Sequence, residues 1–259
     1  MPALSDQELL RYSRQIMLPE IDIAGQERLR GAHCVVMGLG GLGSPVAVYL
    51  AAAGIGKLTL VDPDVVDDSN LQRQIVHREA GIGQAKTESA AQALQALRSD
   101  LELTLVSSAP HERELRGLFA GADVVADGTD RFSSRYAINR ACWASGTPLV
   151  SGAAIRWSGQ VAVFDPQIVD APCYQCLHPD EGAQLDAAMN CAENGVIAPL
   201  VGVIGALQAM EVIKLLTGVG PPRSARCPVT LYDAKYGEWQ TVTLTRNPAC
   251  PVCAAGAIA

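Results

Sequence analysis

Hydrophobic residues recur along the chain in short blocks that polar, glycine-containing turns separate. Short apolar runs are typical of buried strands, and longer stretches with apolar positions three or four residues apart are typical of helices. Strand and helix patterns alternate with short connections, which predicts a mostly parallel sheet with helices on both faces. The expected strands are 33–37, 57–61, 101–106, 123–126, 149–155 and 160–164. One expected helix ends at Ala53, and three others span 85–98, 112–119 and 131–145.

The two ends of the chain have different patterns. Residues 4–30 mix leucine and isoleucine with charges and predict one or two amphipathic helices. Residues 165–195 lack periodicity and predict a long crossover loop, which in compact domains is usually functional or mobile. A helix over 197–217, antiparallel strands near 229–233 and 239–245 and a cysteine-bearing tail should follow. We expect one domain over 1–259, made of N-terminal helices 1–30, a core 31–165, and the loop, helix, strands and tail 166–259.

Composition narrows the classes of partner and compartment. The chain has 259 residues, a formal net charge of −7 and a pI near 5.1, so it lacks the basic character of a nucleic-acid-binding protein. The N-terminus has no signal-peptide pattern. Pro199, Glu211 and Lys214 interrupt the longest apolar stretch, which favours a buried helix over a membrane span. We expect a cytoplasmic protein with no membrane partner, whose eight cysteines stay reduced.

A glycine motif follows the first expected strand. Gly38, Gly40 and Gly43 form G-x-G-x-x-G before a helix, where free N–H groups and the helix dipole favour phosphate. Asp62 ends the second expected strand, at the position of an acid that binds ribose hydroxyls. A tight turn without a ligand is the simpler alternative. The order of strand, glycines, helix and acid favours a Rossmann-like nucleotide site, without choosing NAD over ATP.

The residues after Asp62 favour a triphosphate. Arg73 and Lys86 supply cations, and Asp130 at the end of the fourth expected strand is suited to hold Mg²⁺. Asn70 and Gln74 can orient oxygens. Taken one at a time, the simpler interpretations are favoured: Lys86 as a solvated lysine, Asp130 as a helix cap and Asn70 as a turn residue. Their joint placement at the switch point of one sheet favours the interpretation that they form one triphosphate site.

The motifs together resemble the ThiF/MoeB/HesA family, the bacterial relatives of ubiquitin-activating enzymes. The resemblance covers about residues 4–253 and is closest to the MoeB branch, with ThiF as near neighbour. The motifs that carry it are GLGGLGSP, LVDPDVVDDSNLQRQ, GIGQAK, DGTDRF, SGAAIRWSGQV, two C-x-x-C pairs, APLVGVIGALQAMEVIK and NPACPVC. It implies an adenylyltransferase that uses ATP and Mg²⁺ to activate the C-terminal Gly-Gly carboxylate of a ubiquitin-like sulfur carrier, with the small subunit of molybdopterin synthase as the expected carrier.

The resemblance also implies site residues. Arg14 is expected to reach the site of the neighbouring subunit of a homodimer, although an ordinary solvated arginine is the simpler alternative. Catalysis would depend on Arg14, Arg73, Lys86 and Asp130. The nucleotide would contact Gly38, Gly40, Gly41, Gly43, Asp62, Ser69, Asn70, Leu71, Gln72, Arg73, Lys86, Asp130 and Arg131.

The cysteines raise a separate question. Cys173 and Cys176 form one C-x-x-C pair, and Cys250 and Cys253 form another. Four thiolates suit a closed structural Zn²⁺ site, while two local disulfides or unconnected thiols are the alternatives. The family has zinc here, which favours the metal.

The four cysteines outside these pairs have different expected roles. Cys191 is a possible sulfur-transfer thiol by the resemblance and otherwise a spectator, and we favour a dispensable role because the chain looks closer to MoeB. Cys34 and Cys142 are expected in the core, and Cys227 has no assigned role.

Two other functions stay open at this point. An NAD-linked oxidoreductase would share the glycine motif, but the phosphate-binding residues after Asp62 count against it. A non-catalytic scaffold is disfavoured by the presence of Arg73, Lys86 and Asp130. A carrier of the thiamine pathway is the main alternative substrate. Because the chain ends just after Cys253, we expect no appended rhodanese-like domain and a separate protein as sulfur donor.

Overall fold

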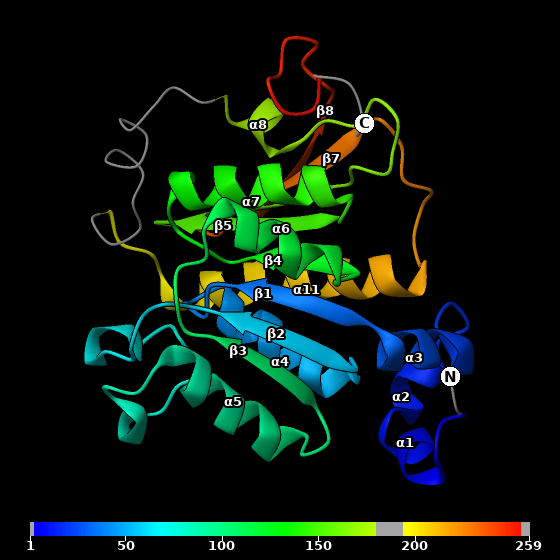
Figure 1. The fold of residues 1–259 in the computed structure, drawn as a ribbon, viewed down its shortest axis with the longest axis vertical. Coiled ribbons are helices and arrows are strands. Elements are labelled where there is room, and N and C mark those ends of the chain that lie inside the picture. The colour runs from blue at the N-terminus through cyan, green and yellow to red at the C-terminus, as the bar shows by residue number, and fades with distance from the viewer. Residues whose placement is uncertain (1–2, 180–193, 255–259) are drawn as a thin grey trace.

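The computed structural model describes residues 3–179 and 194–254, and all structural statements refer to these residues. One eight-stranded sheet runs through the molecule in the order β3-β2-β1-β4-β5-β6-β7-β8 (Figure 1). The first five strands pair in parallel, and β6, β7 and β8 add antiparallel pairs. The strands are β1 His33–Met37, β2 Lys57–Val61, β3 Glu102–Val106, β4 Val124–Asp127, β5 Leu149–Ile155, β6 Ser158–Phe164, β7 Cys227–Asp233 and β8 Glu238–Leu244.

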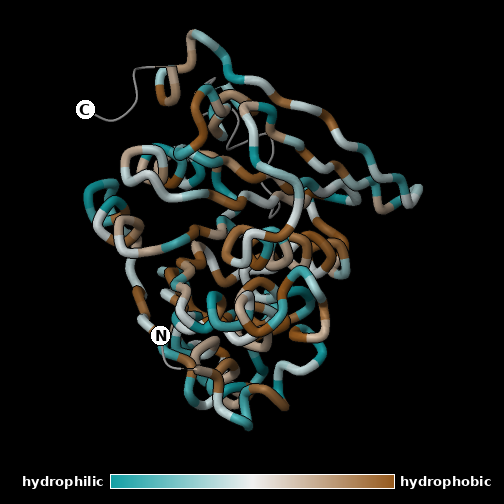
Figure 2. The backbone as a smooth tube through the Cα atoms, turned by 90° about the vertical axis from the view of Figure 1, so that its right-hand side faces the viewer, coloured by the Kyte–Doolittle hydropathy of each residue, from teal (hydrophilic) through white to brown (hydrophobic). Residues whose placement is uncertain are grey.

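Helices cover both faces of this sheet, so the predicted α/β class is confirmed. Buried residues of α4, α5 and α11 form one core with one face, and residues of α6 and α7 form a second core with the other. Figure 2 shows hydrophobic segments through the middle of the molecule. The helices are α1 Asp6–Arg11, α2 Ser13–Ile16, α3 Asp22–Gly31, α4 Gly43–Ala53, α5 Lys86–Leu97, α6 Glu112–Ala120, α7 Phe132–Ser145, α8 Tyr174–Leu177 and α11 Ala198–Thr217.

The central strands are apolar throughout because both of their faces are buried. In β1, Cys34 and Val36 belong to the core beneath α4 and α11, while Val35 and Met37 belong to the core beneath α7. Successive side chains of a strand point to opposite faces, so a continuous apolar run fills both cores. The prediction that Cys34 is a core residue is confirmed, and the same holds for Cys142 of α7.

Three elements differ in detail from the sequence expectations. The region 4–30 forms three short helices, α1 to α3, where one or two were expected. The alternating pattern predicts 160–164 as part of the parallel series, but β6 is antiparallel to β5, because only Arg156 and Trp157 connect the two strands and a parallel return needs a long crossover. The expected structureless loop contains α8, one turn of helix that begins directly after Cys173. Cys191 lies outside the described residues.

The predicted apolar helix is α11. It is long and apolar enough to cross a membrane by length and composition alone. In the fold it packs against α4 and α3 and against strands β4, β5 and β6, and Leu200, Ile204 and Val212 lie in the core. These contacts identify α11 as a core helix, as the interrupted apolar pattern predicted.

Candidate active site and metal centre

A cleft of about 960 Å³ opens at the carboxyl ends of the parallel strands. Met37 at the end of β1 pairs with Val61 of β2 on one side and with Asp127 of β4 on the other, so three strand ends lie level. The chain reverses its direction of winding between β1 and β4, since β2 and β3 lie to one side and β5 to the other. Such switch points are where α/β sheets bind ligands.

The glycine loop joins β1 to α4 at one end of the cleft, and its glycines meet steric demands. Gly38 has φ +81°, a conformation that side chains disfavour. A Cβ atom on Gly43 would lie 1.8 Å from the carbonyl oxygen of Gly38, so only glycine lets the helix start so close to the strand. Gly40 and Gly41 line the cleft together with Gly38. The loop therefore brings backbone N–H groups to the surface of the cleft.

Asp62 and Lys86 form a buried charge pair beside this loop. The Nζ atom of Lys86 lies 4.0 Å from Oδ1 of Asp62 and 3.0 Å from Oδ2 of Asp64. Asp62 also accepts hydrogen bonds from the N–H groups of Leu39 and Asp64, at 2.7 and 2.9 Å. Burial raises the pKa of Asp62, although Lys86 opposes the shift. Lys86 is only 6% exposed, so it is not the solvated helix lysine of the simpler reading.

The segment after Asp62 contributes two polar side chains to the cleft. Arg73 lines the cleft and donates to the carbonyl of Ser69 at 3.1 Å. Gln74 is buried, and its Oε1 atom has no hydrogen-bond partner among the described residues. An orphaned buried oxygen on the cleft wall fits a site that binds a polar ligand, since buried polar atoms are almost always satisfied. Ser69, Asn70 and Leu71 lie in or next to a 3-10 turn and, with Gln72, are not among the lining residues.

The loop after β4 carries Asp130 and Arg131 into the cleft. The N-cap of α7 is Arg131, and no side chain makes the capping hydrogen bond, so Asp130 is not a helix cap. Buried Asp127 shapes the loop by accepting from the N–H and hydroxyl of Thr129, at 2.9 and 2.7 Å. Burial raises the pKa of Asp127, and Arg135 opposes the shift.

Arg135 is a buried cation that the sequence patterns did not single out. It lines the cleft, is 6% exposed and donates to the carbonyl of Thr129 from α7. It therefore holds the loop before Asp130 from the opposite side to Asp127. An arginine in the first turn of a helix has no sequence signature that separates it from a surface arginine, so only its burial reveals it.

The far part of the cleft contains a cluster of aromatic rings. His178 makes ring contacts with Phe132 and Tyr174, at centroid distances of 5.6 and 5.0 Å. Its Nε2 atom lies 3.0 Å from Nε2 of Gln160 on β6. Burial lowers the pKa of His178 to about 4, which keeps the ring neutral at pH 7. This aromatic end of the cleft is suited to a peptide-like segment, whereas the glycine-loop end is suited to anions.

Arg14 lies apart from the cleft. It is exposed on α2, and the residues that line the cleft do not include it. Within one chain the position fits a solvated arginine, and its predicted role in a partner subunit stays a prediction. The predicted residues that the fold does bring to the cleft are Gly38, Gly40, Gly41, Asp62, Arg73, Lys86, Asp130 and Arg131.

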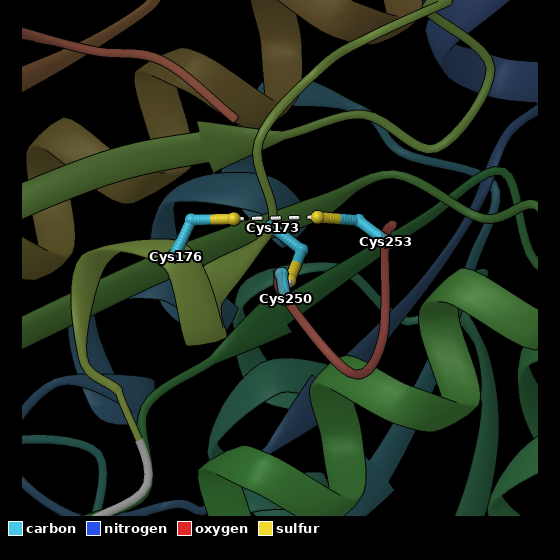
Figure 3. Close-up of side chains that lie close together, drawn as sticks. All are labelled: Cys173, Cys176, Cys250 and Cys253. Atoms are coloured by element: carbon cyan, nitrogen blue, oxygen red, sulfur yellow. Dashed lines mark hydrogen bonds between the residues drawn. The ribbon is translucent and has the colours of Figure 1, made fainter. Parts of the chain in front are cut away.

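A second cluster joins the two C-x-x-C pairs. The Sγ atoms of Cys173, Cys176, Cys250 and Cys253 lie within 4.8 Å of one another (Figure 3). Tetrahedral Zn²⁺ with Zn–S distances of about 2.3 Å separates its sulfurs by about 3.8 Å, so the cluster fits that ion. The cysteines are free, which excludes the alternative of two local disulfides in this structure.

Hydrogen bonds from the surroundings point at these sulfurs. The backbone N–H of Asn247 and the side chain of Asn139 donate to Cys176 and Cys173, at 3.4 and 3.5 Å. Hydrogen bonds from Cys173 and from that N–H lower the pKa of Cys176, and the first of them raises the pKa of Cys173. A thiolate held by outer donors is the state that binds metal. The cluster also fixes α8, which places Tyr174 and His178 in the wall of the cleft.

Comparison with known proteins places this geometry in a family. The model of the ThiF family matches residues 12–252. The chain is 48% identical over 253 residues to the molybdopterin-synthase adenylyltransferase of Escherichia coli, covering 98% of this chain and 99% of that one. It is 42% identical to the sulfur carrier protein ThiS adenylyltransferase of E. coli, covering 96% and 97%. A crystal structure of E. coli MccB with ATP has 25% identity and a TM-score of 0.75, over 89% of this chain and 69% of that one. The chain therefore belongs to the ThiF family.

Proposed function

We infer that the chain is an adenylyltransferase that uses ATP to activate the C-terminal carboxylate of a ubiquitin-like sulfur carrier, with the carrier of molybdopterin synthase as its substrate. The observation that carries this function is the convergence of Asp62, Arg73, Lys86 and Asp130 on one cleft, in a chain 48% identical to an adenylyltransferase of that name. The solved relative that binds ATP supports the choice of nucleotide.

The reaction depends on positioning the two substrates and on stabilising negative charge, and not on proton transfer. A C-terminal carboxylate has a reference pKa of about 3.5 and is ionised at pH 7, so no general base is required. Its oxygen bonds to the α-phosphorus of ATP while the bond from that phosphorus to the bridging oxygen breaks, and pyrophosphate leaves with the electron pair. The protein must bring two anions together and stabilise charge on the leaving group.

The cations of the cleft are suited to that task. Lys86 and Arg73 would hold the phosphates, and Asp62 would bind the ribose beside the glycine loop. Asp130 would hold Mg²⁺, which supplies further positive charge to the phosphate oxygens. The aromatic end around His178 and Gln160 would receive the extended Gly-Gly tail, while the phosphates would lie at the glycine-loop end.

The proposed function also includes a structural metal, a homodimeric assembly and a separate source of sulfur. The four-cysteine cluster would hold one structural Zn²⁺, because four protein sulfurs leave no open position for catalysis. The chain would act as a homodimer in which Arg14 serves the partner's site, in the cytoplasm and as one domain. A separate protein would donate sulfur, and Cys191 would be dispensable for adenylation.

The test is exchange of labelled pyrophosphate into ATP with purified carriers. We expect exchange only with Mg²⁺ and a carrier that ends in Gly-Gly, and faster with the molybdopterin-synthase carrier than with the thiamine carrier. The second relative, at 42% identity, makes the thiamine carrier the alternative substrate. Asp130→Ala should lower the rate on the order of 10²–10³. Wild-type exchange by that variant would contradict the Mg²⁺ assignment, and NAD-dependent oxidation with no exchange would contradict the function.

A further inference from the structure

The residue at the centre of the glycine loop is held on both sides by side chains. The N–H group of Leu39 donates to Oδ2 of Asp62 at 2.7 Å. Its carbonyl oxygen accepts from the hydroxyl of Ser44 at 3.2 Å and lies 3.0 Å from Nε2 of His77. Leu39 and His77 are both buried, at 0% and 4% exposure. The orientation of the peptide groups around Leu39 therefore depends on three side chains, of which His77 was not expected from the sequence.

The partners of His77 determine which ring nitrogen carries its hydrogen. The carbonyl of Leu39 can only accept, so Nε2 must be the N–H donor. Nδ1 lies 3.0 Å from the hydroxyl of Ser89, which can donate to the lone pair of that nitrogen. The ring thus has one satisfied tautomer, which the Leu39 carbonyl selects and in which the Ser89 hydroxyl satisfies Nδ1. His77 connects the glycine loop to α5, the helix that begins at Lys86.

The direction of the Leu39 carbonyl fixes the next N–H group. In a trans peptide the C=O of one residue and the N–H of the following residue point in opposite directions. Since the Leu39 carbonyl points to His77 and Ser44, the N–H of Gly40 points the other way. Within residues 3–179 and 194–254, no acceptor is bonded to the N–H of Gly40 or Gly41, and both glycines line the cleft. If this peptide rotated, a carbonyl oxygen would face the phosphates and repel them.

We propose that His77 is a positioning residue for ATP, which holds the Leu39 carbonyl away from the cleft and thereby aims the Gly40 N–H at the anionic part of the nucleotide. The proposal rests on the proposed function only in taking ATP as the ligand. It assigns no role toward the carrier, because His77 is not among the residues that line the cleft. Its effect should therefore appear in nucleotide binding alone.

The experiment compares two substitutions of the same residue. His77→Leu removes the donor, whereas His77→Gln keeps an N–H in place of Nε2. We expect His77→Leu to raise the KM for ATP and the Kd for ATP without carrier about fivefold to tenfold, the effect of one lost hydrogen bond. The KM for the carrier should stay near the wild-type value, and His77→Gln should restore ATP binding to within about threefold of wild type.

Ser89 provides an independent test that does not require the His77→Leu variant to fold. Ser89→Ala removes the hydrogen-bond partner of Nδ1, which holds the ring against the Leu39 carbonyl, so it should weaken ATP binding in the wild-type background. It should have little further effect in His77→Gln, because glutamine has no ring nitrogen for Ser89 to hold. Equal effects of Ser89→Ala in both backgrounds would overturn the proposal.

A matched control separates positioning from general loss of stability. Phe119→Leu alters a fully buried residue of α6 in the other core and should lower the melting temperature without changing ATP binding. Wild-type ATP affinity in folded His77→Leu, or equal losses in His77→Leu and His77→Gln, would contradict the role of His77. Failure of the wild-type protein to bind ATP at all would instead contradict the proposed function.

Discussion

The Sγ atoms of Cys176 and Cys253 lie 3.3 Å apart although 77 residues separate them in the chain. A second pair, Cys173 and Cys250, brings its sulfurs to 3.6 Å across the same separation. Four cysteine sulfurs gathered in this way fit a shared ion, which would offset the cost of burying thiolates. We therefore predict about one Zn²⁺ per chain by elemental analysis of protein purified without chelator. Fully stable protein with no bound metal would contradict this prediction.

Loss of one cysteine should affect stability through the metal. Cys250→Ala should lower the melting temperature, because metal binding contributes folding free energy, and its melting temperature should no longer respond to chelator. The matched control is Cys227→Ala, a buried cysteine outside the cluster, which donates to the carbonyl of Val163. That variant should keep its zinc and its response to chelator. A chelator response in Cys250→Ala equal to that of wild type would show that the cysteine is not a ligand.

Lys86 should be essential for pyrophosphate exchange. Replacement by methionine keeps most of the side-chain volume but removes the cation that lies 4.0 Å from Asp62 and 3.0 Å from Asp64. We expect the exchange rate to fall about 10²-fold or more, since one electrostatic stabiliser of this kind can contribute that much. The control is Lys57→Met at the opposite end of β2, where the lysine pairs with exposed Glu102. If both variants exchange at the same rate, Lys86 is a structural residue.

Asp62 should limit stability at neutral pH. Burial raises its pKa in the folded protein above the value in the unfolded chain, so the folded state binds the proton more tightly. This contribution to stability is fully present below the unfolded pKa and is lost as the pH rises through the folded value. Asp62→Asn lacks the titration, so its free energy of unfolding relative to wild type should increase across that window.

The measurement is urea unfolding of Asp62→Asn and wild type from about pH 4 to about pH 7, a range that begins near the reference pKa of an aspartate. A difference that is independent of pH would contradict the raised pKa. The same variant should bind ATP more weakly, because asparagine lacks the negative charge that pairs with Lys86. An increase of this stability difference with pH, together with a loss of binding, would identify Asp62 as a residue retained for function.

Local patterns were sufficient to predict most of the sheet and one end of the cleft. The apolar runs, the glycine motif and Asp62 are close together in the sequence, and the place of Asp62 at the end of β2 follows directly from the strand pattern. His77 and Arg135 were missed because their roles depend on hydrogen bonds to the backbone carbonyls of Leu39 and Thr129, and a backbone acceptor leaves no mark in the sequence. The orientation of β6 depended on a turn of two residues that the pattern did not define.

The remaining prediction concerns Arg14, whose place in the fold differs from that of the other predicted catalytic residues. It is exposed on α2 and outside the cleft of its own chain, so a role in catalysis requires a partner subunit. Arg14→Ala and Arg73→Ala should each be weakly active as homodimers. In a two-fold dimer that shares residues, a mixed dimer contains one site that keeps both arginines. Mixing should therefore recover up to about half of the wild-type activity per mixed dimer.

Arg11→Ala is the matched control for that experiment. Arg11 is also exposed, lies one helix earlier and donates to the carbonyl of Leu97 in its own chain. It should remain active as a homodimer, since its contact is local. Subunit exchange in the mixture must be verified by native mass spectrometry with one subunit isotopically labelled. If mixed dimers form and activity does not recover, Arg14 acts within its own chain or not at all. A shared site would require recovery, because one of the two sites in each mixed dimer would contain both arginines.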